Sequence, residues 1–269
     1  AKVLDGGRVL NLRGTTTWSG TTAVNTNDFY TGPGTINNSG TWIDANTFST
    51  VMRDWYAGDA LVFNNSGTYR KTGNTTSALE LAFHNTGTLD VQAGALTLLH
   101  GGSAGAVGSI HIEPTATLSL AAGSFTLDDT TVTGTGRLQV AGTFDSTTSV
   151  VHTGTTTLAG ELSLVGGTLL ANGTLNAATY AQTASNAVLS GTGTVNVAGA
   201  ALGSDGGMAG TGTVTVNGNL AIAGPGDKTI VGGRVINTKG TTTWSGATAI
   251  NANDFYNGPG TINNFGTFV

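Results

Sequence analysis

Short segments in which apolar and polar residues alternate recur along the whole chain. Many follow the pattern Gly-x-Φ-x-Φ, where Φ is aliphatic or aromatic and x is mostly Thr, Ser or Asn. Alternation with period two predicts short strands that bury one face, and the leading Gly tolerates a sharp turn. Helix is disfavoured, because Gly and Thr are weak helix formers. The pattern occurs at residues 87–91, 94–98, 108–112, 123–127, 136–140, 160–164, 193–197, 212–216 and 218–222.

Related phrases return after similar distances, which indicates that the strands stack in coils. Phe63-Asn-Asn-Ser-Gly67 is matched one coil later by Phe83-His-Asn-Thr-Gly87. Two or three strands in such a span are typical of a solenoid in which each coil stacks on the one before. We therefore predict an all-β fold, a right-handed parallel β-helix (β-solenoid) with about 20 residues per coil. A β-sandwich or propeller is the alternative fold, although the two-residue hairpin signals that a sandwich needs are scarce.

A second, much longer repeat joins the two ends of the chain. Residues 6–43 and 232–269 align without a gap, and 28 of the 38 positions are identical. We predict one long solenoid super-repeat over residues 1–231, with 232–269 as the start of the next and equivalent to 6–43. Trp18 and Trp244 should then occupy matching environments.

Asparagines precede several of the turn glycines, at Asn37-Asn38, Asn64-Asn65, Asn85 and Asn263-Asn264. In stacked coils, their side chains could form ladders that bond to the coils above and below. Asn also tolerates turn geometry, and both explanations can hold together.

One stretch interrupts the regular spacing. Ile36-Asn-Asn-Ser-Gly40 and Phe63-Asn-Asn-Ser-Gly67 lie farther apart than the other matched phrases, which predicts a loop insertion within about residues 44–60. A loop on a solenoid often displays binding residues. We name Arg53, Asp54, Trp55 and Tyr56 as a candidate surface binding loop. Trp55 and Tyr56 could instead fold back and cover the flank of the solenoid.

The amino-acid composition of the chain limits the kinds of partner that it is expected to bind. The chain of 269 residues has 9% charged residues, a net charge of −5, and no Cys. The basic residues form no stripe, so we expect no nucleic acid partner. No apolar run is long enough to span a bilayer, and the first residues do not form a signal peptide. The absence of Cys excludes a disulfide framework and thiolate metal sites.

Candidate catalytic residues are few. The four histidines (His84, His100, His111 and His152) lack metal-ligand spacing, and His84 and His111 are interpreted as ordinary substitutions in the repeat. Asp128-Asp129 is the only adjacent carboxylate pair, and stacking could bring Asp145 close to it. A turn-facing acidic patch is favoured over a catalytic pair. We expect no metal, no cofactor and no enzymatic activity.

Threonine pairs of the form Thr-x-Thr would create a flat binding face, such as one for ice, if they stacked regularly. Their spacing along the sequence is uneven, which predicts that they do not form one face. The pairs are Thr15/Thr17, Thr155/Thr157, Thr192/Thr194, Thr213/Thr215 and Thr241/Thr243. The glycine-rich stretch 203–210 lacks the recurring Asp of calcium-binding repeats, so we expect no calcium array.

In the style of its repeats, the chain resembles bacterial extracellular β-solenoid proteins, such as filamentous-haemagglutinin-like exoproteins and autotransporter passengers. The phrases that carry the resemblance are GTTTWSG, FNNSGT, FHNTGTLDVQAGALTL and GTGTVNV. It implies a secreted or cell-surface structural or adhesive shaft, part of a longer tandem-repeat filament. The expected partners are identical repeats or further copies stacked end to end, and surface or matrix glycans. A polysaccharide-binding or polysaccharide-cleaving β-helix is the alternative function.

Overall fold

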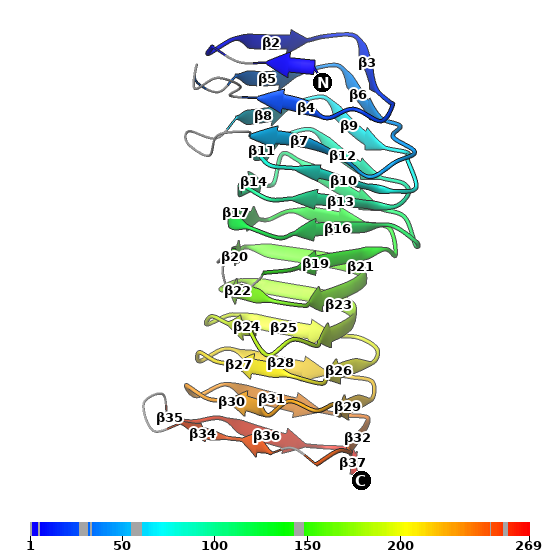
Figure 1. Ribbon diagram of the computed structural model, residues 1–269. Helices are drawn as coiled ribbons and strands as arrows, with labels where there is room; N and C mark the ends of the chain where they lie inside the picture. Colours follow the sequence, from blue (N-terminus) through cyan, green and yellow to red (C-terminus); the bar gives the residue numbers. More distant parts are fainter. Residues whose placement is uncertain are drawn as a thin grey trace.

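The computed structural model describes residues 2–4, 6–26, 32, 34–54, 61–142, 148–247, 249–254 and 258–269. These residues form one elongated solenoid of parallel strands, with no helix among them and with the chain termini at opposite ends (Figure 1). The predicted parallel β-solenoid is confirmed, with successive coils about 22 residues apart. At one strand spacing per coil, the stack is on the order of 50 Å long.

Each coil contributes strands to three faces. The first face is a separate sheet of 12 parallel strands. Its members are β2 (Val9–Leu12), β5 (Thr35–Asn38), β8 (Val62–Asn65), β11 (Ala82–Asn85), β14 (Gly102–Ala104), β17 (Gly123–Asp128), β20 (Thr148–Thr153), β22 (Gly167–Ala171), β24 (Ala187–Ser190), β27 (Gly206–Met208), β30 (Lys228–Ile230) and β33 (Ile250–Asn251).

The second face follows the first in every coil and belongs to a larger sheet of 23 strands. It is formed by β3 (Thr15–Trp18), β6 (Thr41–Asp44), β9 (Thr68–Lys71), β12 (Thr88–Val91), β15 (Ser109–Ile112), β18 (Thr131–Thr133), the first halves of β21 (Thr155–Leu164) and β23 (Thr174–Gln182), β25 (Thr194–Val197), β28 (Thr213–Val216), β31 (Val235–Thr238) and β36 (Thr261–Asn264).

The third face completes the coil. It is joined to the second through β21 and β23, the long strands that run around the corner between these faces. It contains β1 (Lys2–Leu4), β4 (Val24–Thr26), β7 (Thr50–Asp54), β10 (Thr76–Leu79), β13 (Ala95–Leu98), β16 (Thr117–Leu120), β19 (Arg137–Val140), β26 (Ala201–Gly203), β29 (Leu220–Ile222), β32 (Thr241–Trp244) and β37 (Thr267–Phe268), with the second halves of β21 and β23. A short antiparallel pair, β34 (Asn253–Asp254) and β35 (Gly258–Pro259), lies near the C-terminal end.

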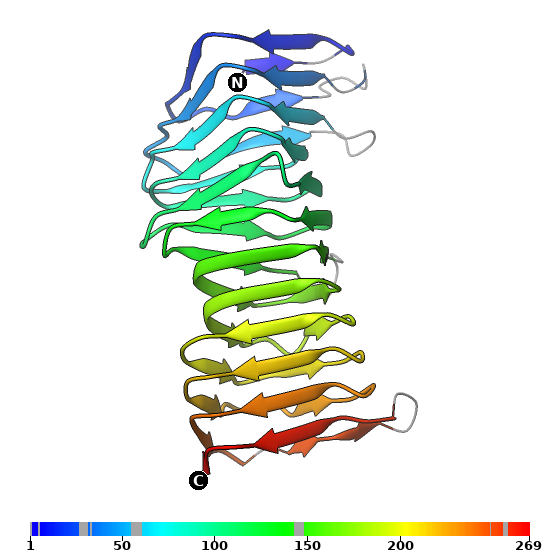
Figure 2. The same cartoon turned by 180° about the vertical axis from the view of Figure 1, so that it is seen from behind.

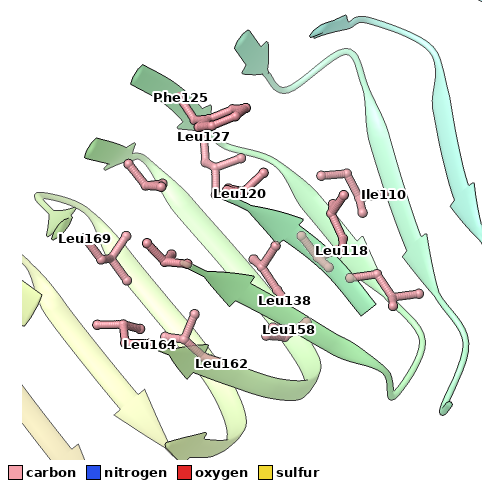
Figure 3. Packing of buried hydrophobic residues seen from close by; sticks show 14 of the residues in the cluster. Ile110, Leu118, Leu120, Phe125, Leu127, Leu138, Leu158, Leu162, Leu164 and Leu169 are labelled. Carbon is pink, nitrogen blue, oxygen red and sulfur yellow. The ribbon is translucent and has the colours of Figure 1, made fainter. Parts of the chain in front are cut away.

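The interior is filled by the apolar positions of the alternating strands. Figure 3 shows aliphatic side chains from successive coils stacked in columns, and Leu118, Leu138 and Leu162 are register neighbours in one such column. All three are at most 2% exposed. Burying such side chains is the main stabilising contribution.

Aromatic side chains take over the core of the N-terminal coils. Trp42 stacks on Tyr69 with ring centroids 6.3 Å apart, and Phe63 stacks on Phe83 at 5.3 Å. Trp18 lies 6.3 Å from Trp42. Rings that lie one strand spacing apart favour such offset contacts.

The glycines that precede the second-face strands are not needed for the reason expected from the sequence, which was a sharp turn. A Cβ on Gly67 would lie 2.1 Å from the carbonyl oxygen of Gly40, and one on Gly87 would lie 2.1 Å from that of Gly67. Neither Gly67 nor Gly87 has a positive φ. These glycines are therefore required by the close axial approach of one corner to the next, and not by a left-handed turn.

The predicted asparagine ladders are present, and in the N-terminal coils one runs inside the solenoid and another along its surface. Inside the solenoid, Asn38 Nδ2 donates to Asn65 Oδ1 and Asn65 Nδ2 donates to Asn85 Oδ1, both at 2.7 Å. On the solvent side, Asn64 donates to Asn37 and Asn37 donates to Asn11, both at 2.9 Å. The inner ladder also donates to corner carbonyls, such as that of Thr88.

Coil length varies, but the strands stay in register. Ile36 pairs with Phe63 across a long coil, whereas Phe83 pairs with Gly102 across a short one. The difference in coil length is accommodated in the turns between the strands. The predicted long coil is thus present, and its additional residues lie between β6 and β8.

The two copies of the long repeat lie on different faces. Val9–Leu12 forms β2 on the first face, whereas the equivalent Val235–Thr238 forms β31 on the second. All later repeat strands are likewise displaced by one face, so the long repeat spans ten coils and one further face. The expectation of matching environments for Trp18 and Trp244 is wrong, because Trp18 is 7% exposed and Trp244 is 45% exposed.

Replacing Asn65 by Ala should destabilise the protein, because it removes two ladder bonds and the bond to Thr88. Buried partners left unpaired cost about 1–3 kcal/mol each, so we expect a loss of at least about 2 kcal/mol. Denaturant unfolding measures it. The neighbouring Asn64→Ala, which breaks the solvent-side ladder, is the matched control and should cost less than about 1 kcal/mol. Equal losses would show that the inner ladder has no special role.

Candidate functional surface

The outer surface of the second face carries a long column of hydroxyl residues. The column begins at Thr15, Thr41 and Thr68, which are consecutive register partners, and continues through Thr88, Ser109 and Thr131 to Thr157. A parallel column begins at Thr155 and runs through Thr174, Thr194 and Thr213. The Thr-x-Thr pairs do not form one face, as expected, because Thr241 and Thr243 lie on β32 of the third face. The hydroxyl columns arise because the axial register aligns Thr and Ser residues from coils of different length.

The outer surface of the second face changes character along the axis. In the N-terminal half, the column beside Thr41 and Thr68 contains Ile43 and an ion pair in which Arg70 Nε lies 2.9 Å from Asp90 Oδ2. In the C-terminal half, Asn196 donates to Asn176 at 2.9 Å, and Asn176 donates to Thr157 at 3.2 Å. Within the described part of the second face, the regular array of Thr and Asn thus lies in the C-terminal half.

The acidic corner holds Asp128 and Asp129 in structural roles. Asp128 Oδ1 accepts a hydrogen bond from the Thr153 hydroxyl at 2.6 Å, and Asp129 Oδ1 accepts the Thr155 N–H at 2.6 Å. Asp129 has a φ of 47°, the one positive value at a non-glycine among the described residues. Asp145 lies outside the described residues. The two carboxylates fix the corner between β20 and β21.

His152 lies inside the solenoid beside this corner. It is fully buried, and neither ring nitrogen has a hydrogen-bond partner in the structure. Burial lowers its pKa from the usual 6.5, and the nearby charges of Asp128 and Asp129 oppose this shift. The sequence did not predict that His152 is buried. Its register with Leu127 and Ala171 becomes clear only from the stacking of the coils.

The other histidines lie on the surface side, His84 and His111 in strands and His100 between β13 and β14. His84 takes the position of Asn64 in the next coil, and its Nδ1 lies 2.8 Å from Ser103 Oγ. His111 Nδ1 lies 2.9 Å from Thr133 Oγ1. His100 is exposed. For His84 and His111, these positions agree with ordinary substitutions in a repeated strand.

The candidate binding loop is described only in part. Arg53 and Asp54 end β7 on the third face, where Arg53 is the register partner of Asn25. Trp55 and Tyr56 lie outside the described residues. The structure therefore places the first two residues at the beginning of the inserted segment, and the binding role stays a prediction.

A shallow groove lies on the first face, over β27 and β30. It has a volume of about 500 Å³ and is lined by Val188, Met208, Asp205, Asp227 and Val231, among others. Gly207 gives it depth, because this position has no side chain where neighbouring coils have Val188 and Thr229. Asp227 Oδ1 accepts the Ala249 N–H at 3.0 Å, and Asp205 Oδ1 accepts the Gly206 N–H at 2.8 Å.

An internal cavity of about 50 Å³ lies in the same part of the solenoid, lined by apolar side chains such as Val214 and Ile236. It is too small for a sugar or an organic cofactor. Within the described ranges, no cluster of three or more His, Asp or Glu residues could hold a metal ion. No helix in the described part of the chain could span a membrane.

Comparison with known proteins found no matching family, no similar curated protein and no similar solved structure. The assignment of function therefore depends on the physical features of the solenoid itself.

His152 predicts a pH-dependent stability. Its pKa is lower in the folded chain than in the unfolded one, so the unfolded state binds more protons below about pH 6.5. The stability contributed by keeping His152 neutral is complete above that pH and decreases as the pH falls. The melting temperature should therefore decline from about pH 7.5 to about pH 5.

His152→Leu should flatten this decline, because Leu fills a similar volume and does not titrate. His100→Gln, which changes an exposed histidine, is the control and should leave the decline unchanged. An unaltered pH profile in His152→Leu would contradict the assignment.

Proposed function

We propose that this chain is a shaft segment of a bacterial extracellular fibre or surface protein, with a structural or adhesive role. The observation that carries the proposal is the uninterrupted stack of hydrogen-bonded parallel strands along the described length (Figure 2). The interior of this stack is filled mostly by apolar side chains. Such a stack holds its ends a fixed distance apart. Its rigidity follows from backbone hydrogen bonds that run parallel to the long axis.

Location at the cell surface is supported by composition and repeat style. The outer positions are mostly Thr, Ser and Asn, and Cys is absent. The repeats resemble those of exported solenoid proteins that act as stalks. A role outside the cell is part of the proposal.

We also propose that the chain has no hydrolytic or lyase activity. Asp128 and Asp129 are the best carboxylate candidates, and both bond to groups of the next coil. An acid–base pair would instead direct both carboxylates toward a cleft that can hold a substrate. The proposed function therefore depends on shape and surface.

A shaft should tolerate the removal of a whole coil. Deleting residues 174–193 joins Gly173 to Thr194, the register partner of Thr174, and preserves all three faces. We expect a rod shorter by about 5 Å in small-angle X-ray scattering. Cells that display this variant should attach to surfaces as well as cells that display the parent chain.

The double substitution Thr174→Lys and Thr194→Lys is the comparison variant. It changes the outer surface of the second face and leaves the number of coils unchanged. Loss of attachment in this variant, with its fold intact by circular dichroism, would contradict a purely structural role and assign attachment to the second face of the shaft.

Polysaccharide binding is a second candidate function, and the groove over β27 and β30 favours it. Its volume of about 500 Å³ suits a few sugar rings, and it combines the apolar Val188 and Met208 with two carboxylates. Carboxylate oxygens accept hydrogen bonds from sugar hydroxyls.

If the groove binds polysaccharide, Asp227→Asn should weaken binding at least about tenfold, because it removes a charge-assisted hydrogen bond. The Asn oxygen can still accept the Ala249 N–H, so the fold should survive. Titration calorimetry against a panel of neutral polysaccharides measures the effect. Glu161→Gln, on the third face, is the control. No binding by the parent chain, or equal binding by Asp227→Asn, would exclude this function.

A further inference from the structure

A buried polar cluster occupies the corner where two neighbouring coils leave the second face. Asp44 ends β6 and Lys71 ends β9, and these residues are register partners in adjacent coils. Asn46 follows shortly after the end of β6. Asp44, Asn46 and Lys71 are all fully buried. An amine, a carboxylate and a carboxamide are thus enclosed together, away from solvent.

The carboxylate of Asp44 lies between the other two groups. Its Oδ1 accepts a hydrogen bond from Asn46 Nδ2 at 2.7 Å, and its Oδ2 lies 3.9 Å from Lys71 Nζ. The Tyr69 hydroxyl also donates to Oδ2, at 3.2 Å. The carboxamide oxygen of Asn46 has no hydrogen-bond partner in the structure, although it is buried.

The backbone places the residue that accepts the lysine hydrogen bond directly over Asn46. Gly73 lies directly over Asn46, since a Cβ on Gly73 would lie 1.9 Å from the Asn46 carbonyl oxygen. Lys71 Nζ donates to the Gly73 carbonyl at 2.8 Å. The lysine side chain therefore bends toward the residue that lies on top of Asn46.

The environment also favours a reactive amine. Burial lowers the pKa of Lys71, and the charge of Asp44 opposes the shift. Burial, together with Asp44, raises the pKa of Tyr69, so its phenol stays protonated as a donor to the carboxylate. A desolvated lysine with a lowered pKa is a better nucleophile than an exposed one, because a larger fraction of its amine is neutral.

We propose that Lys71 and Asn46 react with each other after folding to form an amide bond between neighbouring coils. Lys71 Nζ forms a bond to Asn46 Cγ, and the bond between Cγ and Nδ2 breaks. Ammonia leaves, so one ammonium side chain and one carboxamide become one amide and one ammonium ion. The step requires no oxidant, reductant or other reactant.

Asp44 is the catalytic residue of this step. Its carboxylate takes a proton from the lysine ammonium, which releases the neutral amine for attack. Rotation of the Asn46 carboxamide brings its unpaired oxygen toward the protonated carboxyl, which then donates to the developing oxyanion. The same proton leaves with Nδ2 as ammonia. One carboxyl group thereby serves both the attack and the departure of the leaving group.

The bond would link residues 46 and 71 across the longest coil, which contains the insertion. A covalent link that closes a loop of this kind restricts the unfolded chain and resists unfolding by force. It would supply, without Cys, the kind of stapling that disulfides give other extracellular proteins. This inference is independent of the proposed shaft function, since it concerns only the chemistry of one corner.

Mass spectrometry of the purified, denatured chain tests the proposal. The intact mass should be lower than the sequence mass by one ammonia. Trypsin cuts after Lys and Arg and should not cut after a modified Lys71. It should therefore release residues 14–53 joined to residues 71–137 as one branched peptide. Fragmentation of that peptide should place the link at Asn46 and Lys71.

Variants separate the proposed reaction from other losses of ammonia, such as cyclisation at Asn172-Gly173. Asp44→Ala, Asn46→Ala and Lys71→Arg should each restore the full mass and the unbranched peptides. Lys228→Met, at another buried corner, is the control and should keep the branched peptide. Residues 14–53 and 72–137 recovered as separate peptides from the parent chain would overturn the proposal. A link at Asp44 with loss of water would overturn it as well.

Discussion

The whole structure depends on one constraint, which is that parallel strands stack at a fixed spacing in strict register. Each inward side chain must then lie directly over an inward side chain of the next coil, at a distance of about 4.8 Å. Side chains that interact well with their own kind at this distance are therefore favoured. The leucine columns, the aromatic stack at Trp42 and Tyr69, and the inner asparagine ladder are three solutions to the same requirement.

The same constraint limits which residues can occupy the corners between the faces. Backbones approach so closely there that Gly67 cannot carry a Cβ. Corner carbonyls also need donors, and buried cations provide some of them. Arg234 donates to the carbonyl of Ala209, Lys228 to that of Gly226, and Lys71 to that of Gly73. An unpaired buried charge is costly, so the carboxylate of Asp44 beside Lys71 is a natural complement.

The sequence predicts the strands well, because alternation and turn glycines are local signals. It also predicts the ladder of Asn38, Asn65 and Asn85, since these residues occupy the same place in one repeated phrase. It fails where the result depends on axial register. The threonine column, the burial of His152 and the meeting of Asp44 with Lys71 each join residues whose separation is set by turn length, and turn length varies between coils. The roles of Arg53, Asp54, Trp55 and Tyr56 stay open for a related reason, because their segment does not follow the phrases that repeat in other coils.

The displacement of the long repeat by one face has a geometric consequence. A polymer built from such units would follow a screw axis, in which each unit is turned by about a third of a revolution relative to the one before. Any surface motif encoded once per unit would then point in three directions in succession and return to its first direction only in the fourth unit. A fibre of this kind would present its binding motifs all around its circumference, although each single unit has only one side that carries them.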